Sequence, residues 1–151
     1  MTEPTVQHAT IVIERNYDAT PARVFAAFAD PAERAQWHVP GDDWEVTEHE
    51  HNFRVGGSLK SRFGPKGAPV YFNDGVYLDI VPDARIISAG TMHSGETPTS
   101  TTLCTVELLA DGAGTRLILT DQSAFLDGHE EPADRKTGWG AILDKLDMHL
   151  Q

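Results

Sequence analysis

The C-terminal segment reads Gly138-Trp-Gly-Ala-Ile-Leu-Asp-Lys-Leu-Asp-Met-His-Leu-Gln151. Its apolar side chains recur three, four, seven and eleven positions after the tryptophan, so the repeated set is Trp139, Ile142, Leu143, Leu146 and Leu150. This spacing places them in one stripe along an α-helix, which must bury that stripe against another element. Because the preceding residues read mainly as short alternating strands, the expected partner is an antiparallel sheet. A long helix that lies across a curved sheet can leave a pocket between them.

The rest of the chain predicts one strand, two short helices and then a run of strands. The first strand is expected at residues 9–17, and Thr20-Pro21 is a helix-start signal. Asp30-Pro31 breaks the helical region, so a second short helix is expected at 32–37. Further strands are expected at 44–51, 58–63, 70–72, 75–81, 85–92, 101–109 and 116–121, with hairpin chemistry at Asn52–Gly57. Residues 123–131 read as a loop, and the closing helix is expected to begin near Pro132.

Length and charge limit the classes of function. A chain of 151 residues predicts a single domain over residues 1–151. Twelve Lys and Arg against 23 Asp and Glu give a net charge of -11, which disfavours nucleic acid and anionic membranes as partners. No run reaches the ~20 apolar residues of a membrane span, and the N-terminus lacks a signal-peptide pattern, so we expect a cytoplasmic protein. The one cysteine, Cys104, excludes an internal disulfide.

Several local strings occur in an order that resembles a known family. They are Val24-Phe-Ala-Ala-Phe28 with Asp30-Pro31, Trp37-His-Val-Pro40, Arg54-Val-Gly-Gly57, Gly114-Thr-Arg-Leu117, and Gly138-Trp139 leading into Leu143-Asp-Lys-Leu146. Together they span almost the whole chain and resemble the START-like SRPBCC superfamily. Within it, the chain is similar to the group named for activator of heat-shock-protein-90 ATPase homologues, which also includes self-resistance proteins that bind polyketide-type toxins.

The resemblance implies an α+β helix-grip fold of the START-like or Bet v-like kind. In that fold a curved antiparallel sheet wraps around a long C-terminal helix, two short helices follow the first strand, and a hydrophobic cavity opens near those helices and the first hairpin. One position departs from the pattern of the group, where an Asp usually stands two residues before the hairpin Arg. Here that residue is Asn52, which can form an Asx-type turn but no charged pair with Arg54.

Candidate ligand-binding residues follow from the resemblance together with residue type. Aromatic rings and thioethers suit a flat or irregular apolar ligand, and Arg54 could meet a carboxylate or phenolate. The candidate set is Trp37, Trp44, Arg54, Tyr71, Tyr77, Met92, Cys104, Trp139 and Leu143. Core packing is the alternative for the apolar members, because strand alternation does not say which of them point inward. A turn-stabilising or surface role is the alternative for Arg54.

The sequence offers little conventional catalytic or metal chemistry. His49 and His51 would share one face of a strand, but no third metal ligand presents itself, so we expect no metal and no cofactor. Cys104 has no neighbouring His or basic residue to stabilise a thiolate. Nothing pairs the strand carboxylates Glu50, Asp79 and Asp121, and the chain contains no nucleophile elbow, phosphate-binding glycine loop or HExxH string.

The function that these observations favour is binding of a small hydrophobic or aromatic molecule between sheet and helix. Two alternatives stay open. One is an enzyme of the polyketide cyclase or dehydratase type, which requires an inward carboxylate, tyrosine or arginine near its substrate. The other is a chaperone-partner module, as the name of the group suggests. The sequence leaves a homodimer through an exposed strand edge open, and it does not identify the ligand.

Overall fold

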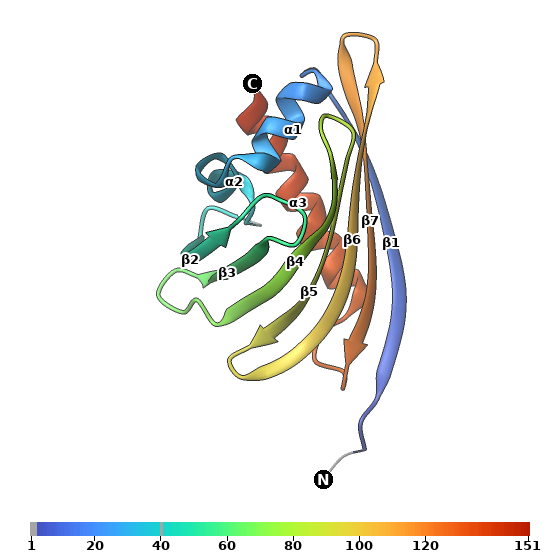
Figure 1. The fold of residues 1–151 in the computed structure, drawn as a ribbon. Helices are drawn as coiled ribbons and strands as arrows, with labels where there is room; N and C mark the ends of the chain where they lie inside the picture. Colours follow the sequence, from blue (N-terminus) through green and yellow to red (C-terminus); the bar gives the residue numbers. More distant parts are fainter. Residues whose placement is uncertain (1–2, 40) are drawn as a thin grey trace.

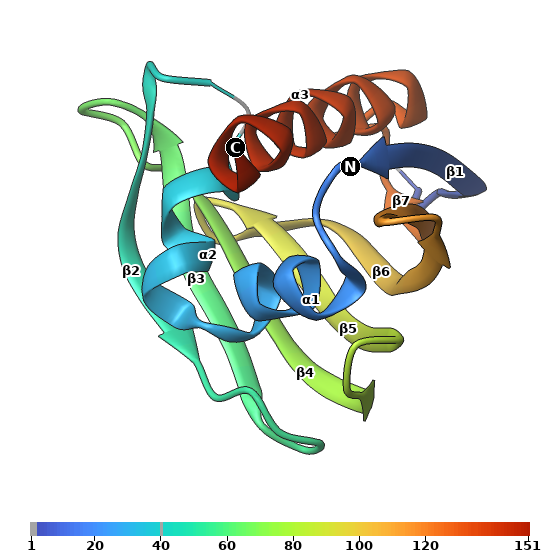
Figure 2. The same cartoon turned by 90° about the horizontal axis from the view of Figure 1, so that it is seen from above.

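The computed structural model describes residues 3–39 and 41–151. Figure 1 shows a strongly curved sheet with the long α3 on its inner side, and Figure 2 shows α1 and α2 on the same concave side of the sheet. The elements are β1 (Val6–Tyr17), α1 (Pro21–Ala29), α2 (Pro31–Trp37), β2 (Trp44–His51), β3 (Ser58–Pro65), β4 (Tyr71–Val81), β5 (Arg85–Ser94), β6 (Thr97–Asp111), β7 (Gly114–Leu126) and α3 (Pro132–Leu150).

The seven strands form one antiparallel sheet in the order β1-β7-β6-β5-β4-β3-β2. The first strand therefore pairs with the last, in a register from Val6 opposite Leu126 to Tyr17 opposite Thr115. The other six strands follow one another as a meander. Register shifts in the β2–β3, β4–β5 and β5–β6 pairs mark bulges, which increase the local bend and twist of a sheet. This is the predicted helix-grip topology.

The first short helix begins where its capping residues predict, and the second begins at Pro31, one residue before the expected start. The Thr20 hydroxyl accepts from the backbone N–H of Arg23 at 3.2 Å, and Pro21 is the first residue of α1. Asp30 ends α1 through its own N–H, and its carboxylate accepts from the N–H groups of Ala32 and Glu33 at the start of α2. One aspartate thus terminates one helix and caps the next.

The apolar stripe of α3 faces the sheet, as its spacing predicts. Leu143 and Leu146 are fully buried, and the other three members of the stripe pack partly buried against the same core. The sheet contributes Ile11, Ile13, Leu117 and Leu119, among others, to this core. The buried phenol of Tyr17 donates to the Leu143 carbonyl at 2.9 Å, which fixes the helix against β1. In the part of the chain that the structure describes, no helix is long and apolar enough to cross a membrane.

Several predicted boundaries are wrong. Residues 70–72 and 75–81 do not form two strands, because β4 runs without a break from Tyr71 to Val81. The loop predicted at 123–131 is a strand up to Leu126, and β1 begins at Val6 rather than residue 9. The errors at the start of β1 and at the end of β7 have one cause. Residues 6–8 and 124–126 pair with each other, and hydrogen bonds between distant segments leave no local pattern.

Candidate functional site

A small hollow lies between α2 and the inner face of β2, β3 and β4. Its volume is about 20 Å³, which is room for roughly one water molecule. It is lined by Arg34, Ala35, His38, Val46, His49, Leu59, Ser61, Phe63 and Asn73. We call it the inner hollow. It lies beside the small helices and the β2–β3 hairpin, the region where the resemblance places the entrance of a cavity.

Arg34 is the dominant charge of the inner hollow. It lies on the buried face of α2 and is only 7% exposed. Its guanidinium donates to the hydroxyl of Tyr77 at 3.3 Å and to Nε2 of His38 at 3.2 Å. The same group lies over the rings of Phe28 and Trp37, 5.5 and 6.0 Å from their centroids. No carboxylate of the described residues forms an ion pair with Arg34, so its close partners are all neutral or aromatic.

Three histidines around Arg34 are held in the neutral form. Burial, and then the charge of Arg34, lowers the pKa of His51 to about 3. The same two causes lower the pKa of His49 and bring the pKa of His38 well below the ordinary value. Burial raises the pKa of the Tyr77 phenol. At neutral pH the cluster therefore carries the single positive charge of Arg34.

The hydrogen bonds of Arg34 assign one proton of this cluster. Arg34 can only donate, so Nε2 of His38 accepts and its proton sits on Nδ1. The Tyr77 hydroxyl accepts from Arg34 and shares a second hydrogen bond with Nε2 of His51, whose direction depends on the His51 tautomer. Nδ1 of His51 is buried and has no hydrogen-bond partner. The cluster therefore contains a buried polar nitrogen without a partner.

Three rings on the inner face adjoin the hollow. Trp44 stacks on Tyr71 with centroids 5.7 Å apart and planes at 7°, and Phe63 lies 6.1 and 5.8 Å from these two rings. All three side chains are half-buried. We call them the aromatic platform. Phe63 also lines the inner hollow, so the platform adjoins the hollow through this ring.

A second polar network joins α3 to β6 and β7. The fully buried Asp121 accepts from Arg135 at 3.1 Å and from the indole N–H of Trp139 at 2.9 Å. Its other oxygen accepts from Ser123. Arg135 also pairs with Glu130 at the start of α3. Asp121 is therefore the inward carboxylate that an enzyme would require, but protein donors already engage both of its oxygens.

The candidate residues from the sequence lie in several places, and none of the nine lines the inner hollow itself. Trp44 and Tyr71 belong to the aromatic platform, and Tyr77 bonds to Arg34. Trp37 and Leu143 are core residues, and the Trp37 indole donates to the Ala27 carbonyl at 3.1 Å.

The remaining four candidates are more scattered. Met92 and Cys104 are half-buried on β5 and β6, and burial, then Asp121, raises the pKa of the Cys104 thiol to about 12. Trp139 lies edge-on to His38, with centroids 5.5 Å apart. Arg54 is exposed in the β2–β3 connection. A role in binding stays a prediction for all nine.

Sequence reasoning missed the residue at the centre of the site. Arg34, Trp37 and His38 stand at positions i, i+3 and i+4 of one helix, so a buried tryptophan there indicates that the arginine shares its face. His49 and His51 do lie together, with ring centroids 5.4 Å apart, as their spacing predicts. Within residues 3–39 and 41–151, no group of three possible ligands could hold a metal ion. Glu50 is exposed, and Asp79 pairs with Arg85 on the outer face.

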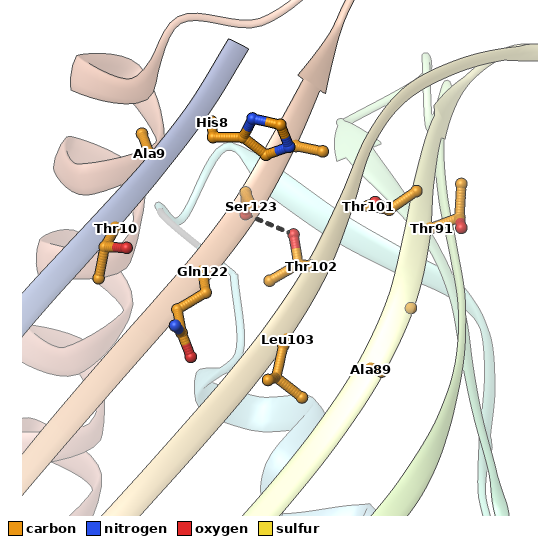
Figure 3. Close-up of a pocket in the computed structure, with 12 residues that line it drawn as sticks. His8, Ala9, Thr10, Ala89, Thr91, Thr101, Thr102, Leu103, Gln122 and Ser123 are labelled. Carbon is orange, nitrogen blue, oxygen red and sulfur yellow. Dashed lines mark hydrogen bonds between the residues drawn. The ribbon is translucent and has the colours of Figure 1, made fainter. Parts of the chain in front are cut away.

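A larger hollow lies on the opposite, outer face of the sheet. Figure 3 shows it over β1, β7, β6 and β5, where outward side chains such as Thr10, Thr101 and Leu103 surround it. Its volume is about 840 Å³, but it is wide open to solvent and its lining contains no carboxylate, lysine or arginine. Its lining has polar side chains such as Thr101 and Gln122, but it has no charged group like Arg34 and no enclosing wall, so we place the functional site at the inner hollow despite the difference in size.

A seven-stranded antiparallel sheet that grips a C-terminal helix defines a protein of the helix-grip class. The family model described as activator of Hsp90 ATPase homolog 1-like protein matches residues 18–151, and the chain belongs to this family. No curated protein matches the chain.

Solved structures extend the comparison. An uncharacterised protein from Rhizobium leguminosarum is 37% identical over 99% of this chain and 98% of its own, with a TM-score of 0.89. The Mll3558 protein from Rhizobium loti is 43% identical over 96% and 99%, with a TM-score of 0.87. DynU16, a protein of the dynemicin biosynthetic locus, is 20% identical over 93% of this chain and 46% of its own, with a TM-score of 0.70. At that identity the likeness to DynU16 shows the fold alone.

Proposed function

We propose that this protein binds a small molecule with an aromatic or apolar body between α2 and the inner face of β2, β3 and β4. The observation that carries the proposal is the aromatic platform of Trp44, Phe63 and Tyr71, whose rings stay half-exposed beside a polar hollow. Aromatic faces of this kind offer offset stacking to a flat guest. Covering them would release apolar surface from water, worth ~25 cal/mol per Å².

The small volume of the inner hollow determines how a guest can be held. About 20 Å³ cannot enclose a whole ring system, so the body of the guest must lie on the aromatic platform. Only a small substituent can enter the hollow unless side chains move. Such a site differs from the fully roofed cavity that the resemblance implies, and it still combines an apolar surface with a few converging polar groups. The resemblance to a group that includes proteins binding polyketide-type toxins is the reason to include polyketide-type compounds in a search for the ligand.

A thermal-shift screen of flat aromatic compounds, preceded by native mass spectrometry of the purified protein, tests the proposal. We expect a ligand to co-purify or at least one compound to raise Tm. Tyr71→Ala should then weaken binding by about tenfold, because each aromatic stacking contact contributes on the order of 1 kcal/mol or more. Phe72→Ala is the matched control, since the neighbouring ring lies on the outer face of β4 under Arg62. Absence of any ligand and any shift would count against binding.

An enzyme is the second candidate, and one observation favours it. The fully buried Tyr77 hydroxyl bridges Arg34 and His51, an arrangement in which the phenol could position Arg34, which lines the hollow, against a bound molecule. Turnover of a bound compound that is lost in Tyr77→Phe, with binding retained, would establish this function. No feature in the described part of the chain favours the chaperone-partner alternative.

A further inference from the structure

We infer that the bound molecule carries an anionic group, such as a carboxylate or phenolate, which enters the inner hollow and pairs with Arg34. This inference rests on the proposed function, because it names the chemical class of the molecule that the same site binds. Three features of the site support it: the charge of the cluster, its incomplete hydrogen bonding, and the size and position of the hollow.

The charge of Arg34 is not balanced by the protein around it. Arg34 is only 7% exposed, and burying an ionised group without a counter-charge is costly. The carboxylates of α2 and of its N-cap are engaged elsewhere. Glu33 pairs with Arg23 at 2.6 Å and bonds to His149 at 2.7 Å, and Asp30 is exposed and caps the helix. The rings of Phe28 and Trp37 recover part of the cost through cation–π contact.

The hydrogen bonds of the cluster are also incomplete. Arg34 has five N–H donors, and within the described residues it makes two side-chain hydrogen bonds, to Tyr77 and His38. The buried Nδ1 of His51 has no partner. His49 is neutral at physiological pH and its ring lies against that of His51. An anionic group supplies acceptor oxygens for Arg34 and the missing charge, and hydrogen bonds between ionised partners are the stronger kind.

The hollow has the size for a substituent and opens next to the platform. Its volume of about 20 Å³, room for roughly one water molecule, admits one oxygen of an acidic substituent, and Ser61 and Asn73 add polar side chains to its lining. Phe63 belongs both to this lining and to the aromatic platform. A ring stacked on the platform can therefore direct an acidic substituent toward Arg34. The class that fits is an aromatic acid rather than a neutral hydrocarbon or a cation.

Matched probes separate this inference from the proposed function. Isothermal titration calorimetry at pH 7.5 compares the affinities of three acid–amide pairs: benzoate and benzamide, 2-naphthoate and 2-naphthamide, and anthracene-2-carboxylate and its amide. We expect the acid of at least one pair to bind about tenfold or more tightly than the amide. Arg34→Gln should reduce that ratio to within about twofold, and Arg34→Lys should keep part of it because the charge remains. Arg62→Gln, an arginine on the outer face, should leave the ratio unchanged.

The outcomes are distinct. If no member of any pair binds, the proposed function fails and the inference fails with it. If acid and amide bind equally, or Arg34→Gln keeps the preference, molecules bind here but not through an anionic group at Arg34. Circular dichroism checks that the variants fold. Should Arg34→Gln not fold, ¹³C NMR of carboxyl-labelled 2-naphthoate on the unaltered protein decides the question. Contact with Arg34 lowers the carboxyl pKa of the bound probe, whereas a merely apolar site raises it.

Discussion

Replacing Arg135 with methionine should lower the free energy of unfolding by about 3–5 kcal/mol. Arg135 makes six hydrogen bonds, to Asp121, Glu130, Ser100, Thr102 and Ser123. Methionine fills much of the same volume but offers none of these donors. The substitution therefore leaves two carboxylates inside or at the edge of the fold without their cation.

The magnitude follows from the burial of the pair. The Asp121 side chain is 0% exposed and that of Arg135 is 12% exposed, so water can replace little of the lost interaction. Removing one partner of such a pair strands a buried charge, which costs far more than the pair contributes when intact. For Asp121 the indole of Trp139 and the Ser123 hydroxyl remain as donors, which keeps the expected loss within this range. A domain of this kind has a total stability of about 5–15 kcal/mol, so the loss is a large fraction of it.

Urea denaturation followed by circular dichroism at pH 7 measures the change in the free energy of unfolding. In a thermal melt of the same variant, Tm should fall by about 6–20 °C. Arg116→Met is the matched control. Arg116 pairs with Glu14 at 2.8 Å on the outer face, but the two side chains are 46% and 51% exposed, so the loss should be under about 1 kcal/mol. Adding Asp121→Asn to Arg135→Met should recover part of the stability, because the buried charge is gone. Equal losses in the Arg135 and Arg116 variants would refute the reasoning.

Three further predictions concern the core and pH. Leu143→Ala should lower the free energy of unfolding, measured in urea, by about 2–5 kcal/mol because the side chain is fully buried. Met148→Ala, which removes a side chain 73% exposed on the same helix, should change it hardly at all. Similar losses in the two variants would contradict the assigned helix face. Tyr17→Phe should cost about 1–2 kcal/mol, since the Leu143 carbonyl would lose its buried donor, and an unchanged urea midpoint would argue against that bond. Burial, then Arg34, holds the pKa of folded His51 near 3, and the unfolded value is ~6.5, so the unfolded chain takes up the proton first. The stability contributed by neutral His51 is therefore complete above about pH 6.5 and is lost as pH falls toward 3. His51→Gln should reduce the loss between pH 7 and pH 5 by about 2 kcal/mol, and a pH profile identical to that of the unaltered protein would disprove it.

The sequence predicts the elements and the fold class well where local signals exist. Thr20, Asp30 and the two prolines that follow them mark the helix starts, and the α3 stripe predicts the buried side of the last helix. It fails at the long ends of the sheet. The pairing of residues 6–8 with 124–126 joins the two ends of the chain, so neither segment contains a sign of its partner.

The candidate site is predicted less well. Residue type correctly draws attention to Trp44 and Tyr71 as rings that could stack, and the structure brings them together at 5.7 Å. Residue type also selects Trp37, which packs at the centre of the core. It passes over Arg34, because an arginine in a short helix is usually solvated and only its burial in the fold makes it exceptional.

The sequence by itself determines the order of helices and strands, where the first and last helices begin and which side of α3 is apolar, because these depend on residues a few positions apart. Only the tertiary structure decides that Arg34, Tyr77 and His51, from α2, β4 and β2, form one cluster, and that Asp121 is neutralised by Arg135 rather than free. The physical reason is that burial and charge pairing depend on the neighbours in space. Those neighbours are set by the curvature of the sheet and the packing of α2 and α3 against it.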